Sequence, residues 1–465
     1  MRPESNRTPS AQRGFSILEL VISMLIAIEI LVAAAIAFDV HNHLATIQTQ
    51  VTDVQQSLRV AQYDMARLVR MAGRGGIPGE LHPDAVFNPG APIPDLGGLA
   101  IEIRNNVTNA TDRHIARGDV NSPEALTGTD ILIVRGCFSS SIYQLNQGSF
   151  AYDPTDPTQA SAPFPDVSVT QIRQPLDPLC EELNARGTAT MVLLSPEARS
   201  VYGIANITGH DCPVGGPPGS TINLQFNLGT NSPLNPVPPG GGARSYPLLP
   251  VPMEVSLACR LEEYRYYVRE EREDPTDPSS QLRPRLTRAR FEPGTELPYA
   301  GDVQSFSLDL ADGVFDLQIA LGLDSDFPAA NSTTPGAFDD DLDFDNSFND
   351  EIIFEGTVAG NDRNADDWLF NDPGDAVNNI RYREHQFTGR VGLPVSLYFV
   401  RITTLARTNR PDRKYRAPDF DPDPGRDFVE DHDYDQAPAN MFKDLENRKY
   451  RRRALTTIVE PRNIS

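Results

Sequence analysis

The first feature of the chain is a long apolar run close to its N-terminus. Residues 1–13 are polar and Gly14 follows them, and then the 24 residues from Phe15 to Phe38 are apolar except for two serines and two glutamates. About 20 apolar residues suffice for a helix to cross a bilayer. The pattern therefore predicts a membrane-spanning helix over 15–40. The arginine-bearing leader should stay cytoplasmic, and the rest of the chain should be exported.

A second pattern continues from this run without a break. Apolar residues recur at spacings of three and four, at Leu44, Ile47, Val51, Val54, Leu58, Ala61, Met65 and Leu68. This spacing is typical of one stripe on an amphipathic helix. Since no Pro or Gly interrupts residues 15–72 and a Gly/Pro cluster follows at 73–78, we expect one helix over 15–72. Its outer part, within 41–76, should pack on the chain's own sheet, and its inner part on other subunits.

The remainder, residues 77–465, alternates short apolar runs with polar turns. Runs rich in β-branched residues predict strands at Leu99–Ile103, Asp130–Val134, Thr190–Leu194, Thr221–Leu228, Val255–Leu257, Glu263–Val268, Val303–Leu308, Phe315–Leu321, Leu397–Ile402 and Ala454–Val459. Between them lie segments expected to be surface loops: 153–178, 213–252, 274–284, 328–350 and 411–439. The expected class is α+β, with a long N-terminal helix packed on an antiparallel β-rich head that has large loop insertions.

Composition narrows the choice of partners. The chain has 465 residues and a formal net charge of −23, from 41 Lys+Arg against 64 Asp+Glu. Such a surface repels phosphate backbones, so nucleic acid is not expected as a direct partner.

The four cysteines are Cys137, Cys180, Cys212 and Cys259, and none form a CxxC pair. In an exported chain an even number of widely spaced cysteines indicates two disulfides. Three pairings are possible, and the sequence does not choose among them.

A conventional signal peptide is the alternative for the N-terminus, because Ala35-Ile36-Ala37 supplies small residues where a signal peptidase could cut. However, an ordinary signal core is about 7–15 residues long, shorter than this run. Glu19 also argues against it, since a carboxylate inside an apolar helix is costly and usually marks function.

The residues Arg13-Gly14-Phe15-Ser16-Ile17-Leu18-Glu19-Leu20 resemble the processing site of type IV prepilins. The resemblance implies that a prepilin peptidase cuts between Gly14 and Phe15, removes the leader 1–14, and methylates the new N-terminal Phe15. The α-amine of Phe15 is cationic near neutral pH, and Glu19 of a neighbouring subunit offers the opposite charge. Pairing lowers the cost of placing each charge in a low-dielectric setting, so it would fix the register between helices.

Glu29 is a second acid in the same run and is not part of the general prepilin pattern. It either pairs with a partner in the assembled complex or lies near the outer membrane interface; the sequence leaves both open.

Further segments resemble PilW-type minor pilins. They are Arg59–Gly73 at the end of the long helix, Asp312–Gln318 in a strand, Val400–Ile402 with Ala406–Thr408 in a late strand, and Arg451–Val459 with Arg462-Asn463 at the C-terminus. The resemblance implies a role in starting pilus assembly and in a tip complex, supporting adhesion, twitching motility or DNA uptake. The implied partners are other minor pilins, the major pilin, the prepilin peptidase and the inner-membrane assembly platform. The chain would lie in the inner membrane before assembly and on the cell surface afterwards.

An acid-rich segment, 324–375, holds fifteen acids and one base, Arg363. Five of the acids, Asp339, Asp341, Asp343, Asp345 and Asp350, occupy positions 1, 3, 5, 7 and 12 of a calcium-loop-like spacing. Phe344 stands where such a loop has Gly, and Asp350 replaces the bidentate Glu. Calcium binding and a solvated acidic insertion are the two interpretations.

No catalytic constellation is visible, since the seven histidines match no metal-ligand spacing and there is no GxSxG or Walker-type loop. We therefore expect no enzyme. The basic stretch 448–453 could contact DNA or lipid headgroups, but we interpret it as a solvated strand edge near acids. Two other functions stay open: a J-type minor pseudopilin of a type II secretion system, which the segment Arg451–Asn463 disfavours, and a membrane-anchored calcium-dependent adhesin.

Overall fold

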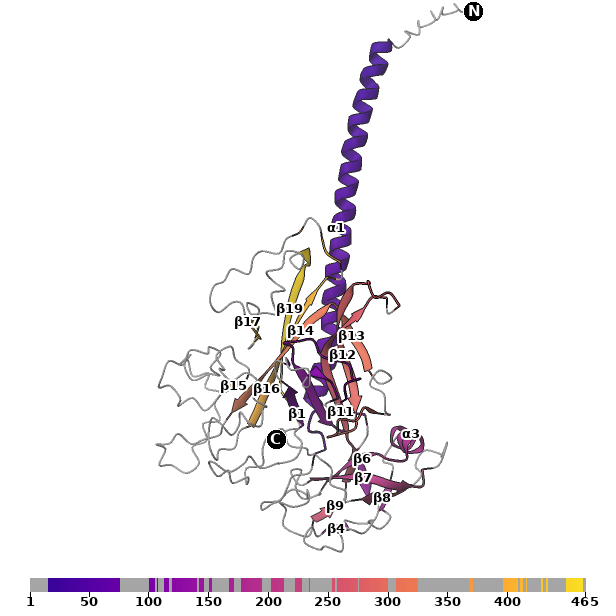
Figure 1. Cartoon of the computed structure of the whole chain (residues 1–465), viewed down its shortest axis with the longest axis vertical. Helices are drawn as coiled ribbons and strands as arrows, with labels where there is room; N and C mark the ends of the chain where they lie inside the picture. Colours follow the sequence, from indigo (N-terminus) through magenta and orange to yellow (C-terminus); the bar gives the residue numbers. More distant parts are fainter. Residues whose placement is uncertain are drawn as a thin grey trace, which may run out of the picture. The chain divides into compact units, whose positions relative to one another are not determined.

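The computed structural model describes residues 16–75, 100–104, 107, 113–116, 119–139, 142–145, 150–152, 167–170, 177–194, 202–212, 222–227, 234, 253–255, 257–274, 276–299, 307–324, 368–370, 396–408, 410–412, 415, 428–429, 432–433 and 449–462. In these residues a long apolar N-terminal helix precedes antiparallel sheets, so the expected α+β class is confirmed (Figure 1). The backbone divides into two units, Met1–Asp53 and Val54–Ser465.

The helix α1 is one continuous element, Ile17–Met71, of 55 residues. The structure places its end where the glycine cluster begins, and Gly73 and Gly75 have φ of 72° and 108°, a conformation that suits glycine. The N–H of Gly73 donates to the carbonyl of Arg135 at 3.0 Å, which ties the helix end to the neighbouring strand. The stripe predicted from the sequence is buried from Val54 onward.

A five-stranded antiparallel sheet has the order β1-β2-β11-β12-β13. Its strands are β1 (Ile101–Arg104), β2 (Ile131–Gly136), β11 (Glu262–Arg272), β12 (Leu282–Phe291) and β13 (Ser307–Asp312). Gly313, with φ of 78°, turns the chain out of this sheet into the next strand. The motif Asp312–Gln318 therefore marks the crossing from one sheet to another.

A four-stranded antiparallel sheet has the order β15-β14-β16-β19. Its strands are β14 (Val314–Asp324), β15 (Trp368–Phe370), β16 (Ser396–Arg407) and β19 (Arg452–Val459). The C-terminal strand β19 is at the edge of this sheet, paired with β16 from Arg452↔Arg407 to Val459↔Val400.

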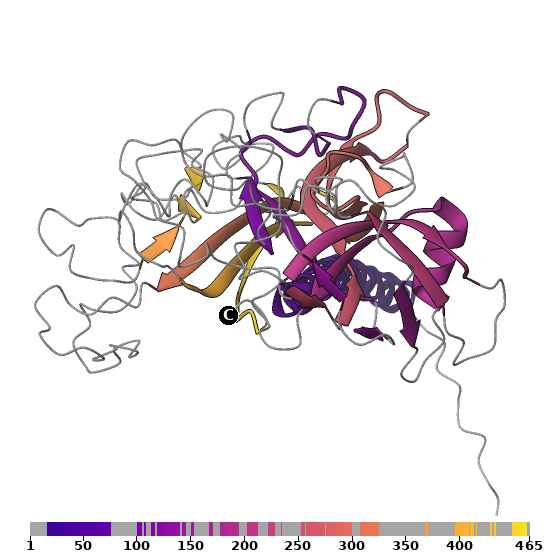
Figure 2. The same ribbon diagram turned by 90° about the horizontal axis from the view of Figure 1, so that it is seen from below.

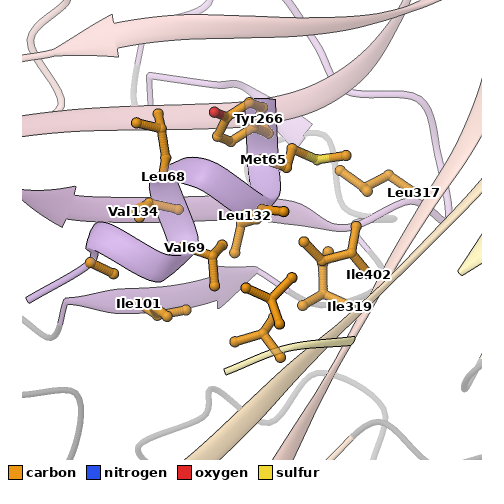
Figure 3. Close-up of a cluster of buried hydrophobic side chains, with 14 of the residues drawn as sticks. Met65, Leu68, Val69, Ile101, Leu132, Val134, Tyr266, Leu317, Ile319 and Ile402 are labelled. Atoms are coloured by element: carbon orange, nitrogen blue, oxygen red, sulfur yellow. The ribbon is translucent and has the colours of Figure 1, made fainter. Parts of the chain in front are cut away.

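The core of the second unit lies between these two sheets. Met65, Leu68 and Val69 of α1 point into a cluster that includes Leu132, Val134 and Tyr266 of the five-stranded sheet (Figure 3). Leu317, Ile319 and Ile402 of the four-stranded sheet close the same cluster. Each of these side chains is at most 2% exposed. Burial on this scale is the main stabilising term, at about 1.5–3 kcal/mol for each large aliphatic side chain.

A closed antiparallel barrel is inserted between the adjacent strands β2 and β11, in the order β10-β3-β5-β8-β7-β6. The barrel strands are β3 (Tyr143–Leu145), β5 (Val167–Thr170), β6 (Thr190–Leu194), β7 (Tyr202–His210), β8 (Ile222–Asn227) and β10 (Leu257–Arg260). A helix, α3 (Asp177–Arg186), precedes β6. Figure 2 shows most of the barrel strands in purple to magenta, on the other side of the head from β14 in orange and β16 in gold.

Two small ribbons complete the described strands. They pair β4 (Phe150–Tyr152) with β9 (Met253–Val255), and β17 (Phe428–Val429) with β18 (His432–Asp433).

Both disulfides expected from the cysteine count are present, and the structure selects one of the three pairings. Cys137 bonds Cys259, and Cys180 bonds Cys212. Cys137 follows β2 directly and Cys259 lies three residues before β11, so this bond closes the base of the inserted barrel. Closing a loop of this length constrains the unfolded chain, which contributes on the order of 4–5 kcal/mol in the chain-entropy model.

Several expected loops contain ordered elements. The segment 153–178 includes β5 and the start of α3, and 213–252 includes β8, so neither is wholly a surface loop. The segment 411–439 includes the β17–β18 ribbon. Very short strands carry little sequence signal, and these are stabilised by distant partners, for example Val167↔Leu224. The segment 328–350 lies outside the described residues.

Candidate assembly helix and its attachment to the head

The part of α1 that belongs to the first unit is the candidate membrane-spanning segment. In the part of the chain that the structure describes, α1 is the one helix long and apolar enough to cross a membrane by length and composition. Its apolar side chains are exposed; Ile17 is 83% and Leu31 69% exposed. A continuous apolar surface of this kind is compatible with a helix surrounded by lipid or by other helices.

Glu19 is exposed in the first turn of this helix. Residues three or four apart share a helix face, so Glu19 lies between Ser16 and Ser23. The Ser23 hydroxyl already donates to the carbonyl of Leu20 at 2.9 Å. Among the residues described, no partner for the Glu19 carboxylate is found within the chain.

Other predicted site residues fall where the structure gives no description. Gly14 and Phe15, the expected cleavage site, lie outside the described residues, as do the calcium candidates Asp339, Asp341, Asp343, Asp345 and Asp350. Within the described ranges, no group of three or more His, Cys, Asp or Glu side chains could hold a metal ion.

In the second unit, α1 is fixed to the five-stranded sheet by a polar contact at Asp64. Its carboxylate accepts hydrogen bonds from Arg288 of β12 at 2.7 and 2.9 Å and from the hydroxyl of Tyr266 of β11 at 2.9 Å. Burial, followed by the charge of Asp64, raises the pKa of Tyr266 well above 10, so this hydroxyl stays a donor. The contact fixes the rotation of the helix on the sheet.

Gln62 makes the matching contact with the four-stranded sheet and is 4% exposed. Its amide donates to Thr404 Oγ1 of β16 at 3.0 Å and to the carbonyl of Leu455 of β19, and its oxygen accepts from Thr457. A single turn of α1, which contains Gln62 and Asp64, is thus bonded to both sheets.

Replacing Asp64 with asparagine should lower the free energy of unfolding of the head by about 1–3 kcal/mol, because charged hydrogen bonds to Arg288 become neutral or are lost. Thermal unfolding of the full chain in detergent measures this effect. Asp53→Asn, an exposed acid of the same helix, is the matched control and should change stability by less than about 0.5 kcal/mol. Equal losses in the two variants would show that Asp64 does not fix the helix.

A buried ion-pair network lies at the strand β11. Glu263 is 0% exposed and accepts from Arg135 of β2 at 2.6 Å, from Arg265 at 2.8 Å and from the N–H of Gly294 at 2.8 Å. Arg265 continues to Glu296 at 2.5 Å and stacks over Phe291 at 3.9 Å. Burial by itself raises the pKa of Glu263, but the charges of Arg135 and Arg265 and the Gly294 N–H lower it below its ordinary value.

A second network joins the barrel to the same sheet. Arg260 of β10 bonds Glu182 of α3 at 2.5 Å and Glu262 of β11 at 3.0 Å. Arg290 of β12 reaches Glu182 at 3.1 Å and stacks on Tyr299 at 3.7 Å. The barrel is therefore held to the sheet by charged contacts as well as by the Cys137–Cys259 bond.

Sequence reasoning missed these networks because β12, Leu-Arg-Pro-Arg-Leu-Thr-Arg-Ala-Arg-Phe, was not recognised as a strand. Unlike the strands that the sequence predicted, β12 has no apolar run, because arginines at 283, 285, 288 and 290 interrupt it. The available signal was partial complementarity with β11, where Tyr264, Tyr266 and Glu271 lie opposite Arg290, Arg288 and Arg283, although Arg269 lies opposite Arg285.

The basic stretch near the C-terminus has acids beside it in the structure. Arg451 pairs with Asp412 at 3.0 Å and stacks on Tyr415 at 4.2 Å, directly before the edge strand β19. The contact agrees with the interpretation of this stretch as a strand edge near acids.

No family model, curated protein or solved structure matches this chain.

Proposed function

We propose that the chain is a minor subunit of a type IV pilus or a closely related filament, of the PilW type, with a structural and not a catalytic role. In this proposal a prepilin peptidase removes residues 1–14 and methylates Phe15. The apolar part of α1 then anchors the chain in the inner membrane and later packs among neighbouring helices. The head, with its barrel, is presented outside the cell with other minor pilins.

The observation that supports this best is a single unbroken helix, Ile17–Met71, with two different surfaces. Its first part is exposed and apolar and carries a carboxylate at Glu19, whereas one face of its last part is buried against two sheets. A detached signal peptide would not need to continue into the core of the folded head. A subunit that packs by its helix requires this continuity, since the helix must connect the filament to the head.

The processing step can be tested at Gly14. Gly14→Val places a branched side chain at the proposed cleavage site, so the precursor should accumulate in the membrane with residues 1–14 attached and be missing from sheared surface filaments. Mass spectrometry of the membrane and filament fractions measures both effects. Ser10→Val, in the same leader, is the control and should be processed normally. Processing of Gly14→Val at the normal rate would argue against a prepilin peptidase.

A further inference from the structure

Glu29 is a second carboxylate on the exposed apolar part of α1, and the assembly role of Glu19 does not account for it. The helix is continuous from Ile17 through Glu29 and beyond, and Glu29 is exposed. In the described part of the chain no side chain or backbone group bonds its carboxylate. Its position along and around the helix decides between the two interpretations that the sequence left open.

The depth of Glu29 argues against a position at the membrane interface. Glu29 lies 12 residues after Ile17 and nine before Phe38, or roughly 18 and 14 Å along the helix axis. If this stretch spans a hydrocarbon core of about 30 Å, Glu29 is close to its middle. Lys and Arg can extend from such depths toward water, but the shorter glutamate side chain has no comparable reach.

Glu29 also lies on a different helix face from Glu19. Ten residues separate the two, which at about 100° per residue turns Glu29 by roughly 80° around the axis and places it roughly 15 Å further along. One partner helix at Glu19 therefore does not present the same group to Glu29.

The surroundings of the two acids differ as well. Glu19 has Ser16 and Ser23 beside it, whereas the neighbours of Glu29 at helical spacing are all aliphatic: Ile22, Leu25, Ile26, Val32, Ala33 and Ile36. All six are exposed. No side chain on this face can hydrogen-bond the carboxylate, so the ionised form in an apolar medium needs a partner from a second molecule.

We propose that Glu29 is a second assembly site, which pairs with a cationic group at mid-membrane depth on the apolar helix of another subunit, distinct from the subunit that engages Glu19. The site rests on the proposed function, because it requires that α1 pack among other helices. The cation is an ammonium or guanidinium: either a lysine or arginine side chain within the partner's helix, or the partner's free N-terminal amine. The two acids, on separate faces, then select two different neighbours and fix the place of this chain in the complex.

The pairing can be measured with the full processed chain in phosphatidylcholine vesicles. The probe is an N-acetylated, leucine-rich transmembrane peptide with one lysine at its centre, and energy transfer reports its association with the labelled chain. The wild type should bind this peptide at least tenfold more tightly than Glu29→Gln does, while Glu29→Asp retains part of the binding. A peptide with leucine in place of lysine should show no preference for wild type. Ser23→Ala, a substitution on the same exposed part of α1, is the control and should bind the lysine peptide as the wild type does.

A second peptide separates the two cation sources. This peptide lacks lysine and has a free N-terminal amine within its apolar stretch. If the wild type binds this peptide and not the lysine peptide, the partner group is the N-terminal amine. Equal binding of both peptides by wild type and Glu29→Gln would overturn the proposal.

Incorporation into surface filaments in cells tells this inference apart from the proposed function. Suppose that Glu19→Gln and Glu29→Gln each reduce incorporation while carbonate extraction shows normal membrane insertion. The Glu29 site and the proposed function then both stand. If Glu19→Gln alone reduces incorporation, the Glu29 site is wrong and the proposed function stands. If neither variant has an effect, the proposed function fails.

Discussion

Replacing Glu19 with valine is expected to abolish incorporation of the chain into filaments, with a fall of at least tenfold in the sheared surface fraction. The variant should still insert in the membrane, because valine makes the helix more apolar. It should also still be processed, since the cleavage site precedes the substitution. What is lost is the counter-charge for the α-amine of the neighbouring subunit, which then lies unpaired in a low-dielectric setting.

The measurement is immunoblotting of sheared filaments and membranes from cells that express each variant. Ser23→Ala is the matched control, because Ser23 shares the face of Glu19 and its hydroxyl already bonds its own helix at the Leu20 carbonyl. It should be incorporated as the wild type is. Normal incorporation of Glu19→Val would support the alternative of an adhesin that is merely anchored by its helix.

Replacing Glu263 with glutamine is expected to destabilise the head by about 3–5 kcal/mol, since it leaves the buried charges of Arg135 and Arg265 without their shared carboxylate. This is a large share of the stability of a typical domain. Denaturant unfolding followed by tyrosine fluorescence measures it. Glu270→Gln, an exposed acid on the same strand, is the control and should change stability by less than about 0.5 kcal/mol.

The same carboxylate predicts a pH dependence with a definite sign. The folded state lowers the pKa of Glu263 below its ordinary value of 4.5, so the stabilising contribution is fully present above that value. As the pH falls below it, the unfolded state takes up the proton first, and the contribution is lost as the pH approaches the lower pKa of the folded state. The wild type should therefore lose stability on acidification more steeply than Glu263→Gln. Parallel acid profiles would show that Glu263 is not the group responsible.

The sequence predicted the helix well because the signals for it are local. Absence of Pro and Gly, an apolar stripe and a terminal glycine cluster all lie within the element itself, and the structure places α1 at Ile17–Met71. Strands with apolar runs, such as β6 at Thr190–Leu194, were also predicted with the observed bounds.

The rest of the fold depends on contacts between residues that are far apart in the chain. The Asp64–Arg288 contact joins residues 224 positions apart, and nothing near either residue indicates the other. The barrel depends on pairing of strands as short as β3, whose three residues carry almost no periodicity. The cysteine count indicated two disulfides, but the pairing of Cys137 with Cys259 follows from β2 and β11 being neighbours in the sheet.

In the proposed function, α1 stays on the mature chain and packs against neighbouring subunits by its apolar surface. N-terminal sequencing of the mature protein, purified from membranes and from sheared filaments, tests it most directly. We predict a single N-terminus at a methylated Phe15 in both fractions. A mature protein that begins after Ala37, beyond the apolar run, would contradict the account and leave an exported β-rich domain without a helix to assemble by.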